Sequence, residues 1–151
     1  MPRGLDIGRR RPRIPDLASE LSTEDVVAVA EFRAALRTFL RKTEQTARHA
    51  GLTPQRYLLL LMIKGAPDGT EKSTVTELAE RLRLAQSTVT ELVRRAEEAG
   101  LVEREPSRSD GRVAHLRLSP EGERRLGQAV RNLAQERAEL RVAFGHLGSV
   151  N

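Results

Sequence analysis

The sequence predicts a mainly α-helical fold that carries one two-stranded β-hairpin. Apolar residues recur at the three- and four-residue spacing of helices over most of the chain. Capping motifs precede several of these stretches, as they do at the start of helices. Residues 101–105 and 113–118 instead have the composition of strands, and the second of these stretches alternates apolar and polar side chains.

Length and composition set limits on the class of protein. The 151 residues fit one globular unit, and the absence of cysteine excludes disulfides, thiolate metal sites and thiol-based redox sensing. The longest apolar run, Leu58 to Ile63, is too short to cross a membrane. We therefore expect a cytoplasmic protein with no membrane segment.

Positive charge is concentrated at the N-terminus. The net charge is +5, and residues 1–15 contribute five arginines against one aspartate, which is +4 of that total. The sequence thus predicts a basic arm, residues 1–20, rather than a basic domain. Two interpretations of this arm stay open, a solvated disordered tail and an arm that contacts DNA.

A long helix is predicted over residues 21–51. Ser22 is its expected N-cap, with Asp25 completing a capping box and Leu21 and Val26 forming a hydrophobic staple. One apolar stripe continues toward Gly51, where the helix is expected to end. At ~1.5 Å per residue this helix is roughly 40 Å long.

The central part of the chain, residues 52–118, contains three shorter helices and the hairpin. Thr53-Pro54 begins a helix that is apolar on every side and hence buried, and Thr74 to Glu77 forms a second capping box. After a tight turn at Leu84-Ala85, a third helix runs to Gly100. This order is that of a winged helix-turn-helix, although an ordinary helical hairpin explains the apolar positions equally well.

The exposed face of that third helix has the residue types that read DNA. Short hydroxyl and amide groups at a helix N-terminus can meet base edges and phosphates, and arginines further along can reach the backbone. Ser87 or Thr88 could instead act as N-caps. The candidate DNA-contacting residues of this helix are Gln86, Ser87, Thr88, Thr90, Glu91, Arg94 and Arg95.

The last segment, residues 119–151, is predicted to be one helix that starts at Ser119-Pro120 and carries a heptad seam. Neither terminal helix can bury its apolar stripe on a three-helix core, so we expect a second copy of the chain to cover both. Arg137 is the only polar residue in this apolar seam, and we expect it to face a carboxylate. If it has no acidic neighbour, binding of an anionic effector explains its position better. The candidate dimerisation residues are Leu126, Val130, Leu133, Arg137, Leu140 and Phe144.

The hairpin LVEREPSRSDGR, between AEEAG and LSPEGERRL, resembles the multiple-antibiotic-resistance regulator (MarR) family, whose wing carries an Asp-x-Arg motif. The resemblance covers roughly residues 52–126. It implies that Arg112 enters the minor groove and that Asp110 braces the wing. Arg108, on the same loop, is a weaker candidate for a phosphate contact. A plain hairpin turn with a solvated arginine is the alternative.

One departure from the family pattern concerns Glu91 and Arg94, because many members have the opposite order of charges there. Glu91 could accept a hydrogen bond from cytosine N4, or it could pair with Arg94 or Arg95 one turn later. We favour the ion pair.

The resemblance further implies a homodimeric repressor that binds a pseudo-palindromic operator in double-stranded DNA. Family members bind small anionic or aromatic effectors between the dimerisation helices and the DNA-binding domain. Candidates that would border such a cleft are Arg33, Arg37, His49, Arg56 and Tyr57, although exposed arginines and a capping histidine explain them more simply.

No enzyme, metal or cofactor is expected, because the three histidines fall in three separate elements with no ligand spacing around them. Two rival functions remain. One is a winged-helix module that contacts other proteins, and the other is a nucleic-acid-binding protein without sequence preference.

Overall fold

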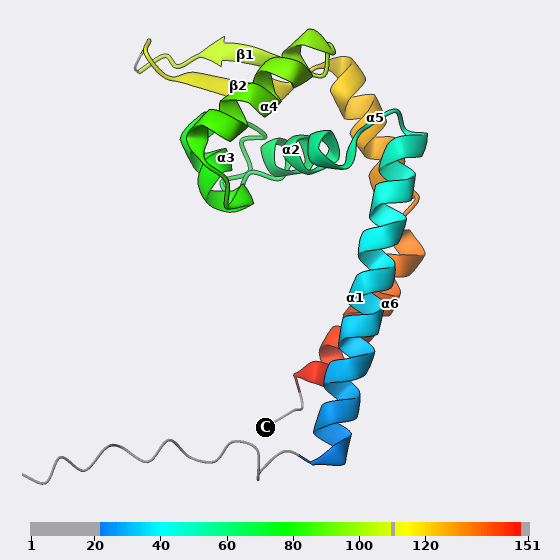
Figure 1. Ribbon diagram of the computed structural model, residues 1–151. Helices are drawn as coiled ribbons and strands as arrows, with labels where there is room; N and C mark the ends of the chain where they lie inside the picture. The colour runs from blue at the N-terminus through cyan, green and yellow to red at the C-terminus, as the bar shows by residue number, and fades with distance from the viewer. Residues whose placement is uncertain (1–21, 110, 149–151) are drawn as a thin grey trace, which may run out of the picture.

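The computed structural model describes residues 22–109 and 111–148, and its architecture is the expected one of helices with a single β-hairpin. Two parts are visible, a winged-helix domain and a long stalk that leaves it at one edge (Figure 1). The elements in chain order are α1 (Thr23–His49), α2 (Pro54–Lys64), α3 (Val75–Leu82), α4 (Gln86–Glu98), β1 (Val102–Pro106), β2 (Ala114–Leu118), α5 (Pro120–Arg131) and α6 (Ala134–Leu147).

The helix starts predicted from capping residues are confirmed. The side chains of Ser22 and Thr74 each accept a hydrogen bond from the backbone three residues later, and Asp25 and Glu77 complete the two capping boxes. Thr53 and Ser119 cap helices whose first turn contains proline. Local sequence therefore sets most of the helix boundaries.

The winged-helix domain is built around α2. Leu59, Leu60 and Ile63 of α2 are fully buried, together with Val89 and Val93 of α4. The prediction that α2 is buried on every side needs one correction, because Leu58 is 44% exposed. One face of α2 thus reaches the surface of the domain.

The wing is an antiparallel pair in which Val102 lies opposite Leu118 and Pro106 opposite Ala114. Ser73, in the loop between α2 and α3, extends this sheet by one bridge. Its backbone N–H donates to the Leu116 carbonyl at 3.1 Å, and the Leu116 N–H donates back at 2.8 Å. The wing is consequently attached to the loop that precedes α3.

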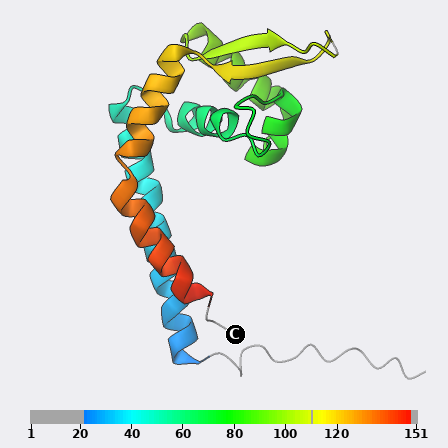
Figure 2. The ribbon, with the colours of Figure 1, turned by 180° about the vertical axis from the view of Figure 1, so that it is seen from behind.

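The stalk consists of α1 and α6, which lie side by side and run in opposite directions (Figures 1 and 2). The rings of Phe32 and Phe144 meet edge to face, with centroids 5.8 Å apart. Along this described stalk only Thr43 and Ala47 of α1 are buried, and no residue of α6 is. Across the described residues, no helix combines the length and apolar character needed to cross a membrane.

The prediction of a single helix over residues 119–151 is wrong, because α5 ends at Arg131 and α6 begins at Ala134. Leu133 has φ −108° and ψ 13°, outside helical geometry. Its side chain is 1% exposed and packs in the same core as Leu126. The chain turns at this point because Leu133 packs into the core formed by the chain itself.

The heptad seam is therefore divided between two environments. Leu126 and Leu133 are buried without a second chain, and Val130 packs against the same core. Further along, Leu140 is half-buried, whereas Arg137 and Phe144 are exposed. Within the described residues Arg137 forms no ion pair. Its positive charge partly offsets the rise that burial causes in the pKa of the Tyr57 hydroxyl in α2.

Candidate nucleic-acid interface

The start of α4 leaves its short polar side chains exposed. Ala85 occupies the N-cap position and makes no side-chain hydrogen bond, so Ser87 and Thr88 lie inside the helix and do not cap it. Both side chains are exposed, as is that of Thr90. The capping interpretation is thus wrong for both residues, and their hydroxyl groups face solvent.

Gln86 is positioned by the helix that precedes the turn. Its Nε2 donates to Oγ1 of Thr76 in α3 at 3.4 Å. The turn between the helices passes through Arg83, which has a left-handed backbone with φ 57°. The Leu84 N–H then donates to the Ala79 carbonyl at 3.1 Å. These contacts fix the first turn of α4 against α3.

A second contact fixes α3 against α2. The guanidinium of Arg81 donates to the carbonyl oxygens of Met62 at 2.6 Å and Gly65 at 3.0 Å. Carbonyls in the last turn of a helix lack partners within that helix, so a cation here satisfies them and complements the helix dipole. Arg81 therefore holds the two helices at a fixed spacing.

Glu91 forms the ion pairs expected from its spacing. Its two carboxylate oxygens accept from Nε and Nη2 of Arg94 at 2.9 and 2.6 Å, and Oε1 also accepts from Nε of Arg95 at 2.9 Å. These hydrogen bonds lower the pKa of Glu91 from its ordinary 4.5 to about 2. Arg94 makes one further hydrogen bond, to Glu98.

A groove of about 400 Å³ runs between α4 and the start of α2. Sequence reasoning missed one of its residues, Gln55, because no local pattern connects this part of α2 to α4. Its side chain is exposed and could reach a phosphate beside α4. The groove is lined by Gln55, Ser87, Thr88, Glu91, Leu92 and Arg95.

The wing lies beside α4 and is tied to it. Nε of Arg104 in β1 donates to Glu97 of α4 at 2.7 Å. At the tip, the Ser107 N–H donates to the Val113 carbonyl at 2.9 Å, and both Arg108 and Arg112 are exposed. Asp110 lies outside the described residues. The two predicted wing arginines are thus exposed at the tip of a wing whose first strand is tied to α4.

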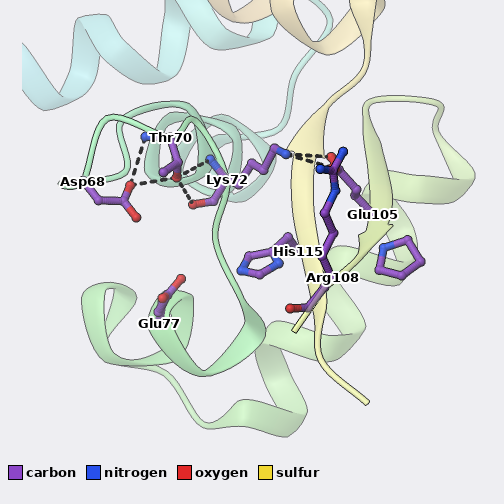
Figure 3. Close-up of a pocket in the computed structure, with 9 residues that line it drawn as sticks. Asp68, Thr70, Lys72, Glu77, Glu105, Arg108 and His115 are labelled. Atoms are coloured by element: carbon purple, nitrogen blue, oxygen red, sulfur yellow. Dashed lines mark hydrogen bonds and ion pairs between the residues drawn. The ribbon is translucent and has the colours of Figure 1, made fainter. Parts of the chain in front are cut away.

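The outer half of the wing and the loop before α3 border an open pocket of about 380 Å³ (Figure 3). Nζ of Lys72 donates to Glu105 at 2.9 Å and thereby lowers the pKa of that carboxyl. The side chains of Glu77 and His115 border the same opening. In the described part of the chain, no group of three or more histidine, cysteine or acidic residues is arranged to hold a metal ion. The Lys72–Glu105 ion pair holds the wing against the loop before α3.

Comparison with known proteins shows which family the central part of the chain is similar to. Residues 50–113, from the end of α1 to the wing tip, match the model of the MarR family. Over these residues the chain is similar to the MarR family. It is 29% identical over 114 residues to YsmB of Bacillus subtilis, described as an uncharacterized HTH-type transcriptional regulator, and the match covers 73% of this chain and 75% of YsmB.

Solved structures of MarR-family proteins have the same fold. A mutant of MarR from E. coli complexed with operator DNA is 22% identical, with a TM-score of 0.59 over 72% of this chain and 75% of that one. The MOSR regulator of M. tuberculosis in complex with DNA is 26% identical, with a TM-score of 0.54 over 73% and 77%. The winged-helix arrangement of α2 to β2 is thus the MarR arrangement.

Proposed function

We propose that this protein is a MarR-family transcription regulator that binds double-stranded DNA sequence-specifically. The observation that carries the proposal is the uncapped, exposed polar face at the start of α4 beside a wing that carries Arg112. A helix of this kind fits the major groove. An arginine on the adjacent wing fits a narrow minor groove, where the negative potential is enhanced. The DNA-bound MarR and MOSR structures support this assignment.

In this proposal each candidate residue has a role. The short side chains of α4 meet base edges, whereas Arg94, Arg95 and Arg108 neutralise phosphates. Arg112 enters the minor groove and Asp110 braces the wing. The residues assigned to base edges are Gln86, Ser87, Thr88 and Thr90.

The active form is proposed to be a homodimer joined through the stalk. Val26, Val27 and Leu40 of α1 and Val142 and Phe144 of α6 are all more than half exposed in the single chain. A stalk with so few buried residues gains little stability from its own packing, because helices in proteins depend mainly on tertiary contacts. A second stalk would cover these residues, together with Leu140 and Arg137.

We further propose that the dimer acts as a repressor and that a small anionic or aromatic molecule releases it from DNA. Tyr57 is 4% exposed, and burial raises the pKa of its hydroxyl, while the charge of Arg137 in α6 acts in the opposite direction. A separate groove of about 230 Å³ on α1 is lined by three arginines, two leucines and one glutamate, namely Arg33, Arg37, Arg41, Leu36, Leu40 and Glu44. A cation beside apolar or aromatic side chains is a suitable receptor for such a molecule.

Selection of duplexes from a random library, followed by sequencing of the bound fraction, tests the function. The expected result is an enriched pseudo-palindrome whose half-sites are ~10 base pairs apart, the separation of two recognition helices in a symmetric dimer. Binding without enrichment would favour the non-specific alternative. A chain that retains no duplex would favour the protein-interaction module.

A further inference from the structure

The recognition helix α4 and the helix α5 contain the same local pattern of charges, an acid followed three and four residues later by two arginines. On α4 these residues are Glu91, Arg94 and Arg95. On α5 the pattern starts at Glu121, whose carboxylate accepts from Nε and Nη2 of Arg124 at 2.9 and 2.7 Å and from Nε of Arg125 at 2.7 Å. The pKa of Glu121, like that of Glu91, is lowered to about 2 by these bonds.

The two clusters differ in what else they contact. On α5, Nη1 of Arg125 also donates to the carbonyl of Gly51 at 2.9 Å, which holds the corner between α1 and α2 against α5. On α4, among the described residues, every side-chain hydrogen bond of Arg94 and Arg95 ends on a carboxylate. The α5 cluster therefore joins parts of the fold, whereas the α4 cluster joins none.

The α4 cluster instead changes the charge of the proposed DNA-binding face. Two carboxylates, Glu91 and Glu98, offset two guanidinium groups, so the cluster has no net charge. Binding to DNA of arbitrary sequence depends on cations that neutralise phosphates and release counterions. Arginines already paired with carboxylates contribute little to that binding, and the carboxylates themselves repel phosphates.

We propose that Glu91 is a specificity-determining residue that ties back Arg94 and Arg95 and thereby weakens binding to DNA of arbitrary sequence. The inference rests on the proposed function. Ser87, Thr88 and Thr90, which precede Glu91 in α4, stay exposed and can still contact bases. When these side chains bind a base sequence that they recognise, the complex becomes stable enough for Arg94 and Arg95 to leave Glu91 and pair with phosphates.

The test is fluorescence anisotropy of a labelled mixed-sequence duplex, titrated at several salt concentrations with the full-length protein and its variants. Glu91→Gln should bind this duplex roughly fivefold more tightly per half-site at low salt, which is the effect of a unit charge ~4 Å from a phosphate in water. The slope of log K against log salt should steepen by ~0.9 for each additional phosphate that the protein neutralises. Glu98→Gln leaves both Glu91 pairs intact and should give a smaller increase in affinity.

Glu121→Gln is the matched control, because it removes the same negative charge, paired with two arginines in the same way, from a helix outside the proposed interface. It should leave both affinity and salt slope unchanged. If wild type and Glu91→Gln bind with the same affinity and slope, the role of Glu91 is wrong while the DNA-binding function stands. If neither binds any duplex, both proposals fail. Tighter binding by Glu91→Gln than by wild type, with no change for Glu121→Gln, supports the inference.

Discussion

A methyl group added at Gly122 would lie 2.2 Å from the carbonyl oxygen of Leu101. Gly122 and Leu101 thus lie close together where the chain enters the wing before β1 and leaves it at the start of α5. Next to these residues, Oγ of Ser119 donates to the Gly100 carbonyl at 2.6 Å, and the Ser119 N–H donates to the Leu101 carbonyl at 3.0 Å. The first turn of α5 therefore packs directly on the backbone that connects α4 to β1.

Gly122→Ala is expected to destabilise the protein, because a backbone carbonyl cannot move aside as a side chain can. Overpacking of this kind costs ~1–3 kcal/mol. Urea unfolding followed by circular dichroism measures the loss. Gly127→Ala on the same helix is the control, because its methyl group meets the flexible end of Arg131 at 3.2 Å. The control should be neutral or slightly stabilising; an equal loss in both variants would contradict the packing argument.

Much of this fold could be predicted because its determinants are local. The capping residues Ser22, Thr53, Thr74 and Ser119 begin four helices at the expected positions. The i+3 and i+4 spacing likewise predicted the pairing of Glu91 with its arginines, since such pairs need no information beyond one helix turn.

The features that sequence reasoning missed depend on tertiary packing. The heptad spacing continues through Leu133, so no local pattern marks the break between α5 and α6; burial of this leucine in the core decides it. Gln55 lies beside α4 because α2 packs there, which no motif near Gln55 predicts. The roles of the wing arginines came from resemblance to a family and remain predictions.

The free energy of unfolding should fall in acid, because Glu91 and Glu121 become protonated and lose their ion pairs. The pKa values of Glu91 and Glu121 are about 2 in the folded protein, against an ordinary 4.5, so the native state favours their ionised forms. This stabilisation is present above pH 4.5 and is lost as pH falls toward about 2. A Glu91→Gln/Glu121→Gln variant should thus be less stable than wild type at neutral pH, with the difference shrinking across that window. Urea unfolding at a series of pH values measures it, and a difference that is independent of pH would contradict the assignment.

Val142→Asp should convert the proposed dimer into a monomer. Val142 is 60% exposed in the single chain, so the substitution leaves the described core intact. In a dimer joined through the stalk, it would bury an unpaired carboxylate at a cost of several kcal/mol. Sedimentation velocity at micromolar concentration distinguishes the two states. Val113→Asp, an equivalent change on the wing far from the stalk (Figure 1), should remain dimeric. A wild-type chain that sediments as a compact monomer would remove the proposal.

Arg112→Ala should reduce affinity for the enriched operator more than affinity for a mixed-sequence duplex. Arg112 is exposed at the wing tip, and a symmetric dimer would make the contact twice. By analogy with good specific contacts, each is worth ~1–3 kcal/mol, so the total loss is twice that value. Fluorescence anisotropy on both duplexes measures the two losses separately.

Two other basic elements serve as controls for this comparison, because they are expected to contact phosphates without reading sequence. Arg108→Ala and deletion of residues 1–13, which lie outside the described residues, should weaken binding to both duplexes about equally. Each should also flatten the slope of log K against log salt by ~0.9 for each phosphate that is no longer neutralised. A minor-groove contact that depends on groove width should instead change the ratio of the two affinities. If Arg112→Ala binds the operator as tightly as wild type, the wing does not make the contact that the MarR family resemblance implies.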